Sequence, residues 1–177
     1  RRIWRNRSQE VTVSSAFVGM MGVSRAMNET GLLVMPQGAD TPWVEVEGTC
    51  YAGTHTRHVL EQVAAGPDLA SRVSQVFRDC PRCGSTIFLF AQPASANLNE
   101  WAVVVEEDHQ GTTLRQPCYS TSHDCVLTQA MVATNHFVER SRPAPHPCQE
   151  DSETRYAAMV AELNGSPVGD VAAMQRV

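Results

Sequence analysis

The sequence predicts a layered α+β domain, and three observations carry that prediction. Residues 11–18 alternate and are β-branched, and residues 85–92 are strongly apolar; both patterns are typical of strands. Between them lie two consecutive segments with helical spacing of apolar residues. A further amphipathic segment follows near the C-terminal end. Sheet, paired helices, sheet and helix indicate an α+β arrangement over residues 1–177, taken as one domain.

In the first part of the chain, residues 11–37 predict two strands joined by a compact loop. The run Gly19 to Gly22 breaks the first strand, and residues 32–35 form the second. The turn between them contains Asn28 and Gly31, two residue types that tolerate a positive φ.

Two helices are expected next. In residues 54–65 the apolar positions lie on one helical face, and Gly66 ends the segment. Pro67 is then predicted at the first position of a second helix. The apolar face of that helix is formed by Leu69, Val73, Val76 and Phe77.

The second half of the chain predicts a strand pair, a further strand and a helix. Residues 85–92 and 101–107 are the pair, joined by a polar hairpin. Residues 129–134 form the further strand and lead into Asn135. Asp151 or Ser152 is expected to cap a helix that closes at Asn164 and Gly165, and a short helical segment follows near 170–176.

Composition excludes several function classes. Hydrophobic residues make up 42% of the chain, charged residues 19%, and the net charge is −5. Apart from the arginine-rich start, which we interpret as a frayed terminus or interdomain surface, no basic stripe suits nucleic acid. No apolar run approaches the roughly 20 residues that span a bilayer, so we expect no membrane partner. The absence of lysine excludes a lysine nucleophile.

The six cysteines are too sparse for a disulfide scaffold. Without a recognisable secretory signal we expect them to be reduced, which favours the cytoplasm. Cys80 and Cys83 stand in a CPRCG pattern typical of a metal knuckle. A second pair of ligands with compact spacing is missing from the sequence pattern, so we predict no metal and no other cofactor. A zinc-stabilised binding module built on this knuckle stays open as an alternative.

Three segments together resemble the acyl-coenzyme A:6-aminopenicillanate acyltransferase, or C45 peptidase-like, family of N-terminal-nucleophile hydrolases. The first is GVSRAMNETGL at residues 22–32, which looks like the family's Met-Asn-Glu-x-Gly-Leu turn. The second is RHVLE at 57–61, followed by CPR at 80–82 and AVVVE at 102–106. The third is ATNHF at 133–137, with SETR at 152–155 downstream.

This resemblance implies an αββα sandwich and an amide hydrolase or acyltransferase that acts on a small-molecule amide or acyl substrate. It also implies an N-terminal cysteine nucleophile whose α-amine, with a pKa near 8, is the base. The family places that cysteine before the turn, whereas no cysteine precedes Gly22 here. We therefore expect a fragment, incomplete at both ends, that has no activity alone. A degenerate, non-catalytic family member is the other interpretation.

Asn135 is the leading site residue, because an asparagine amide at a strand end can donate to a tetrahedral oxyanion. The resemblance places the family's oxyanion-stabilising asparagine at this position. An Asx turn is the alternative role. For its neighbour His136, a partly buried ring bonded to backbone is favoured over a catalytic base.

Substrate contacts are predicted for Arg155, Gln37 and Asn28. Arg155 is expected on the first turn of a helix, where a cation is disfavoured and so needs an acidic partner or a substrate carboxylate. Gln37 stands at a strand end where relatives carry a pocket asparagine. Asn28 is assigned to turn geometry first and to substrate second. Glu106 is expected to face solvent at a sheet edge rather than to point inward.

Overall fold

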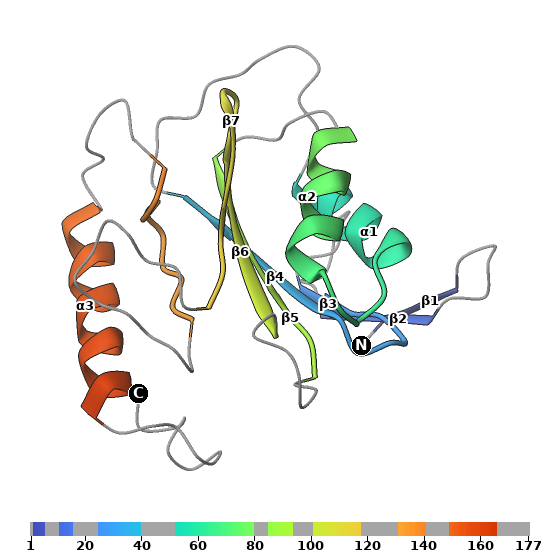
Figure 1. Cartoon of the computed structure of the whole chain (residues 1–177), viewed down its shortest axis with the longest axis horizontal. Coiled ribbons are helices and arrows are strands. Elements are labelled where there is room, and N and C mark those ends of the chain that lie inside the picture. Colours follow the sequence, from blue (N-terminus) through green and yellow to red (C-terminus); the bar gives the residue numbers. More distant parts are fainter. Residues whose placement is uncertain are drawn as a thin grey trace.

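Seven antiparallel strands form one sheet, in which the order in space follows the order in the chain (Figure 1). The computed structural model describes residues 2–5, 11–15, 25–39, 52–79, 85–93, 101–117, 131–140 and 149–165. The strands are β1 (Arg2–Arg5), β2 (Val11–Ser15), β3 (Arg25–Met27), β4 (Leu33–Gly38), β5 (Thr86–Ala91), β6 (Ala102–Asp108) and β7 (Gly111–Arg115).

Two helices, α1 (Ala52–Gln62) and α2 (Leu69–Asp79), cover one face of this sheet (Figure 1). Their apolar sides meet every second residue of the central strands, because successive strand side chains point to opposite faces. Phe88 and Phe90 of β5 and Val103 and Val105 of β6 are buried against the helices. This is the main hydrophobic core.

The opposite face carries an extended segment, residues 131–140, with the helix α3 (Gln149–Gly165) outside it (Figure 1). Phe137 packs on Ile87 and Val104, which are the residues of β5 and β6 that point away from α1 and α2. Val132 and Val138 turn outward to Tyr156 and Val160 of α3. The layers are therefore a helix pair, a sheet, an extended segment and a helix.

The turn between β3 and β4 requires a glycine. Gly31 has a φ of 89°, a conformation that residues with a side chain rarely adopt. Its N–H donates to the carbonyl of Asn28 at 3.0 Å, and the N–H of Asn28 donates to the carbonyl of Leu32 at 3.0 Å. These bonds fix the geometry that the sequence predicts for this turn.

The α+β class, both paired helices and the β5–β6 pair are confirmed, but Pro67 does not occupy the first position of the second helix, because α2 begins at Leu69. The two-strand prediction for residues 11–37 was wrong, because β3 lies between β2 and β4. The arginine-rich start, interpreted as a frayed terminus or interdomain surface, supplies β1, and β7 was not predicted. Residues 131–134 are not a strand, because side chains rather than a strand partner hold this segment. Within the described ranges there is one sheet, so the second sheet of an αββα sandwich stays a prediction.

Helix α3 begins at Gln149, before the predicted cap residues. Ser152 therefore lies inside the helix, where it is buried, and does not act as the cap. Arg155 stands in the second turn rather than the first. The predicted helical segment near 170–176 lies outside the described residues.

Candidate functional site

Asn135 lies where three elements meet: the 131–140 segment, the end of β4 and α3. Its Nδ2 donates to the carbonyl of Gly38 at 2.9 Å, and its Oδ1 accepts from Nη2 of Arg155 at 3.2 Å. A carbonyl can only accept and a guanidinium can only donate, so these neighbours set which way the amide points. Within the described part of the chain the Gly38 contact uses one of the two N–H bonds of Nδ2. The other can face a ligand.

Gln37 precedes Gly38 and lies on the same side of the sheet as Asn135. It pairs with Ile87 across the β4–β5 ladder, and directly opposed residues share a face. Ile87 packs against Phe137 of the 131–140 segment. Gln37 is half-buried. Its side chain therefore extends from β4 toward the layer that contains Asn135.

Arg155 has an acidic partner, although the first-turn position from which that partner was expected was wrong. Its Nε contacts Oδ2 of Asp151 at 3.0 Å, one helical turn earlier. Arg155 is about half exposed, at 48%, and Asp151 is 73% exposed, so water screens the pair. Arg155 thus links α3 to Asn135 while remaining accessible from solvent.

Asn28 is separate from these three residues. Its side chain is buried against α1, where Nδ2 donates to the carbonyls of Leu60 at 3.1 Å and Val63 at 2.9 Å. Its Oδ1 accepts from the N–H groups of Thr30 at 3.2 Å and Leu32 at 3.0 Å. Both amide N–H bonds are therefore used by the backbone. These contacts agree with the role in turn geometry, and the substrate contact stays a prediction.

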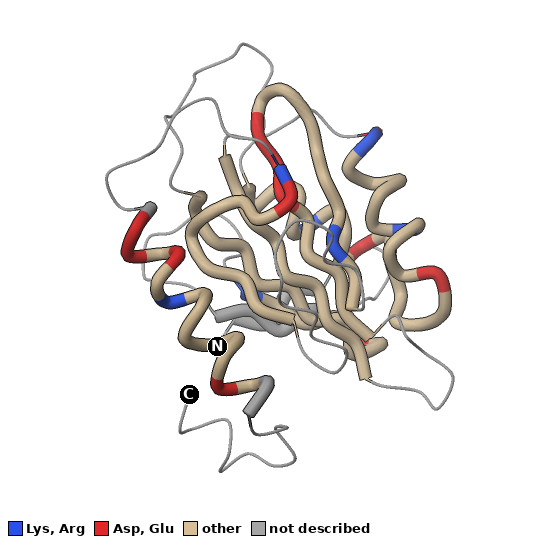
Figure 2. The backbone as a smooth tube through the Cα atoms, turned by 60° about the vertical axis from the view of Figure 1, so that its left-hand side comes forward, with Lys and Arg blue, Asp and Glu red and all other residues tan. Residues whose placement is uncertain are grey.

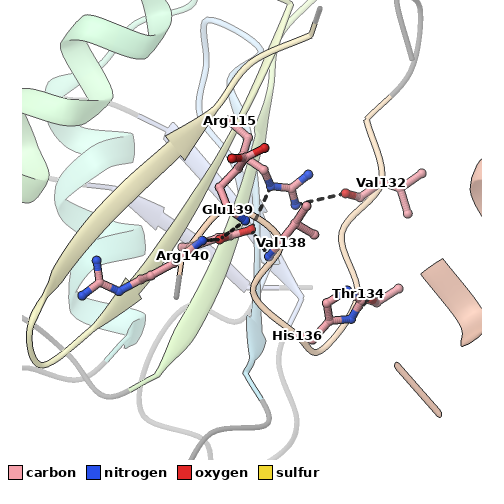
Figure 3. A network of polar contacts seen from close by, with 8 residues as sticks. Arg115, Val132, Thr134, His136, Val138, Glu139 and Arg140 are labelled. Carbon is pink, nitrogen blue, oxygen red and sulfur yellow. Dashed lines mark hydrogen bonds and ion pairs between the residues drawn. The ribbon is translucent and has the colours of Figure 1, made fainter. Parts of the chain in front are cut away.

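Glu106 points inward, so the expectation that it faces solvent was wrong. Its side chain is fully buried, and Oε1 accepts from Nε of Arg115 at 2.8 Å. Three backbone N–H groups also bind this carboxylate: Val138 at 2.8 Å, Glu139 at 3.0 Å and Arg140 at 2.9 Å (Figure 3). The charge is tolerated because four donors replace the water it has lost.

Arg115 extends this network to the other end of the segment. Its Nη2 donates to the carbonyl of Val132 at 3.2 Å, and the side chain is only 5% exposed (Figure 3). The sequence contains one signal for this pair, the run Glu106-Glu107-Asp108 at the end of an otherwise apolar strand. Strand alternation sends neighbouring members of that run to opposite faces, so at least one acid must be buried.

Asp108 closes the network at the β6–β7 hairpin. Its Oδ1 contacts Nη2 of Arg140 at 2.5 Å and accepts from the N–H groups of Gln110 at 2.7 Å and Gly111 at 3.0 Å. Burial by itself would raise the pKa of Asp108, but the hydrogen bond from Arg140 and the backbone N–H groups hold that pKa below its ordinary value of 3.8. Figure 2 shows basic positions, in blue, close to the acidic positions of the run Glu106-Glu107-Asp108, in red.

No protein-family model and no curated protein matches this chain. The fold and the site are therefore interpreted from their own geometry. In the part of the chain that is described, no helix is long and apolar enough to cross a membrane.

His136 has a structural environment rather than that of an accessible base. It is 1% exposed, and its Nδ1 lies 3.0 Å from Oγ1 of Thr134 and 2.9 Å from Oγ of Ser152. The ring also meets Tyr156 edge-on, with centroids 5.4 Å apart. The expectation of a buried ring is confirmed, and two contacts of the ring are with side-chain hydroxyls. His136 thereby connects Ser152 of α3 with Thr134 in the segment that contains Asn135.

The cysteines proposed for a zinc knuckle, Cys80 and Cys83, lie outside the described residues, as do the other four. Among the described residues no group of three or more His, Cys, Asp or Glu side chains could hold a metal ion. The knuckle stays a sequence-based prediction.

Proposed function

We propose that this chain carries the oxyanion-binding part of an amide hydrolase or acyltransferase of the N-terminal cysteine nucleophile type. The observation that carries the proposal is the orientation of Asn135. Its amide is held from both sides, by Gly38 and Arg155, at the end of a sheet strand. An oxyanion donor must be positioned before the reaction, since reorienting it during the reaction would cost energy.

The electrostatics around Asn135 suit this role. Arg155 places a positive charge beside Oδ1 of Asn135, and this charge draws electron density away from Nδ2 of the same amide. The N–H bonds of Nδ2 thereby become stronger donors toward a developing negative charge. Arg155 is shared with Asp151 and is about half exposed, so it polarises the amide without filling the site with unbalanced charge.

In the proposed reaction a cysteine thiol transfers its proton to its own α-amine and attacks the amide carbonyl carbon. The carbonyl oxygen becomes an oxyanion, to which the second N–H of Asn135 donates. Collapse breaks the C–N bond, the leaving amine takes the proton, and a thioester remains. Water or an acceptor amine then releases the acyl group. No cysteine precedes Gly22 in this sequence, so the thiol of this proposal comes from outside the 177 residues.

The proposed substrate is a small acylated amine. Gln37 extends a carboxamide toward the side of the sheet that contains Asn135, and Arg155 offers a solvent-accessible cation for a substrate carboxylate. The proposed αββα sandwich requires a second sheet beyond the described residues. The described sheet, with α1 and α2 on one face, is compatible with one helix layer and one sheet layer of such an arrangement.

A second candidate is a family member that binds acyl compounds without catalysis. The observation that favours it is that both polar atoms of Asn135 already contact protein groups, as they would in a purely structural role.

The test compares two proteins. For the 177-residue chain we expect no cleavage of N-acyl amines. For the same chain extended upstream to its thiol-bearing residue, we expect turnover that Asn135→Ala lowers by about 10² in kcat. Arg57→Ala, which removes an exposed helix pair with Glu61, is the matched control and should leave kcat unchanged. Binding without turnover in the extended protein would favour the second candidate, and unchanged turnover in Asn135→Ala would remove Asn135 from the reaction.

A further inference from the structure

The 131–140 segment needs partners for its backbone, because its described residues form neither helix nor strand. Buried N–H and C=O groups must find hydrogen bonds somewhere. Here the N–H groups of Val138, Glu139 and Arg140 all point at one carboxylate, that of Glu106. Consecutive N–H groups converging on one anion form a nest, and the anion is supplied by the sheet itself.

The ion pair between Arg115 and Glu106 also holds the segment at a second point. Arg115 binds Glu106 and, through Nη2, the carbonyl of Val132. Asn135 lies midway in sequence between Val132 and Val138, the two points that the pair fixes. Between these two points Phe137 packs on Ile87 and Val104 and so holds the backbone against the sheet. The pair and Phe137 together limit how far the Asn135 side chain can move relative to β4.

We infer that Glu106 and Arg115 are the positioning residues of this site: they hold the 131–140 segment so that the Asn135 amide stays at the carbonyl of Gly38. The hydrogen bonds of Glu106 and Arg115 described above go to each other and to the backbone of the 131–140 segment, so each acts through the segment. The importance of this placement for catalysis rests on the proposed function. The placement itself does not.

The chain offers a matched control for this inference in the adjacent residue. Glu107 is also fully buried and also pairs with a basic side chain, because its Oε2 lies 3.0 Å from Nδ1 of His55. It points to the α1–α2 face, where Phe77 and Phe88 surround His55. Glu106→Gln and Glu107→Gln therefore make the same chemical change at neighbouring buried positions on opposite faces.

The experiment records backbone hydrogen exchange and the side-chain NH2 signals of Asn135 by NMR, in the 177-residue protein and both variants. In the unsubstituted protein we expect the amides of Val138, Glu139 and Arg140 to exchange at least about tenfold more slowly than in an unstructured peptide. In Glu106→Gln we expect these amides to exchange about tenfold faster than before, and the Asn135 signals to shift or broaden. Amides of β5 and β6 serve as the internal reference for global stability. In Glu107→Gln the Asn135 signals should keep their positions.

Equal changes at Asn135 in the two variants would overturn the inference, because they would show a general loss of stability. Fast exchange of all three amides in the unsubstituted protein would also overturn it, and this measurement needs no variant to fold. If Glu106→Gln does not fold, Arg115→Lys replaces it: the charge is kept, the contact with Val132 is lost, and the Asn135 signals should still shift.

The outcome is separable from that of the proposed function. Shifted Asn135 signals in Glu106→Gln, combined with unchanged turnover in Asn135→Ala of the extended protein, would leave the positioning role standing and the catalytic role refuted. Unmoved Asn135 signals, combined with a large loss of turnover in Asn135→Ala, would refute the positioning role alone.

Discussion

Glu106 and Glu107 are adjacent in β6 and equally buried, yet they meet different surroundings. Glu107 enters the α1–α2 face, where His55 is its basic partner and phenylalanine rings surround the pair. Glu106 enters the α3 face, where Arg115 and three backbone N–H groups of an irregular segment bind it. One strand thus supplies a buried acid to each side of the sheet.

The difference teaches how each face is held together. On the α1–α2 face the covering elements are helices, which satisfy most of their own backbone groups and need chiefly apolar contacts from the sheet. On the α3 face the layer in contact with the sheet is an extended segment, whose backbone groups need partners from side chains. On the α3 face the buried carboxylate of Glu106 therefore has a backbone-ordering role.

The largest expected effect comes from replacing each buried glutamate and its basic partner by leucines. Glu106→Leu with Arg115→Leu should lower the free energy of unfolding by about 3–5 kcal/mol, because buried N–H groups and the carbonyl of Val132 lose their partners. His55→Leu with Glu107→Leu should cost at least about 2 kcal/mol less, since apolar residues often replace a buried pair with little loss. Urea denaturation of both double variants measures the contrast.

An equal loss in the two double variants would contradict the comparison between the faces. A Glu106 variant as stable as the original protein would show that water or other groups satisfy the 131–140 backbone.

The second-largest expected effect tests whether the α1–α2 face also depends on a buried polar side chain, that of Asn28. Asn28→Ala should lower the free energy of unfolding by about 2–4 kcal/mol, because the carbonyls of Leu60 and Val63 and the N–H of Leu32 lose a buried partner. The exposed neighbour provides the control, and Glu29→Ala should change stability by less than about 0.5 kcal/mol. Thermal or urea unfolding decides, and a loss below about 1 kcal/mol for Asn28→Ala would mean that water replaces its amide.

The smallest effect concerns the hairpin end of the α3 face. The pKa of Asp108 is lowered in the folded protein, so its carboxylate stabilises the fold above its ordinary pKa of 3.8. This contribution is lost as the pH falls through the lower folded value. Asp108→Asn should cost about 1 kcal/mol at pH 7, since asparagine keeps an acceptor for Gln110 and Gly111 but loses the charge facing Arg140.

The difference in stability between Asp108→Asn and the original protein should shrink as the pH is lowered below about 4, in unfolding curves recorded at several pH values. A difference that stays constant across that range would show that the charge of Asp108 does not contribute.

Local patterns predicted the parts of this molecule that local physics controls. Helical spacing around Val59 and Val73 identified α1 and α2, and the apolar run at 85–92 identified β5. The Asn28 and Gly31 pattern identified the turn between β3 and β4, because a positive φ restricts the residue type there. The short strand β7 was not predicted, because its sequence GTTLR has no apolar alternation and its structure depends on pairing with β6.

The site shows the same division. The family resemblance marked Asn135 as a candidate, and its expected position in a helix together with that resemblance marked Arg155. The structure places the two in contact. The run Glu106-Glu107-Asp108 indicated that at least one acid of β6 is buried, but it did not indicate which partners Glu106 would meet. Its burial becomes favourable only when Arg115 and the backbone at 138–140 arrive from elsewhere in the chain.

The sequence by itself determined the α+β class, the paired helices, the glycine turn and the chemical types available for a site. These depend on periodicity and on the allowed φ of single residues, which act over a few neighbours. Only the tertiary structure decided that the carbonyl of Gly38, the Asn135 amide and Arg155 meet, and that Glu106 orders the segment between them. Those contacts join residues that are distant in the chain, and the sequence does not show which acceptor the fold brings to a given hydrogen-bond donor.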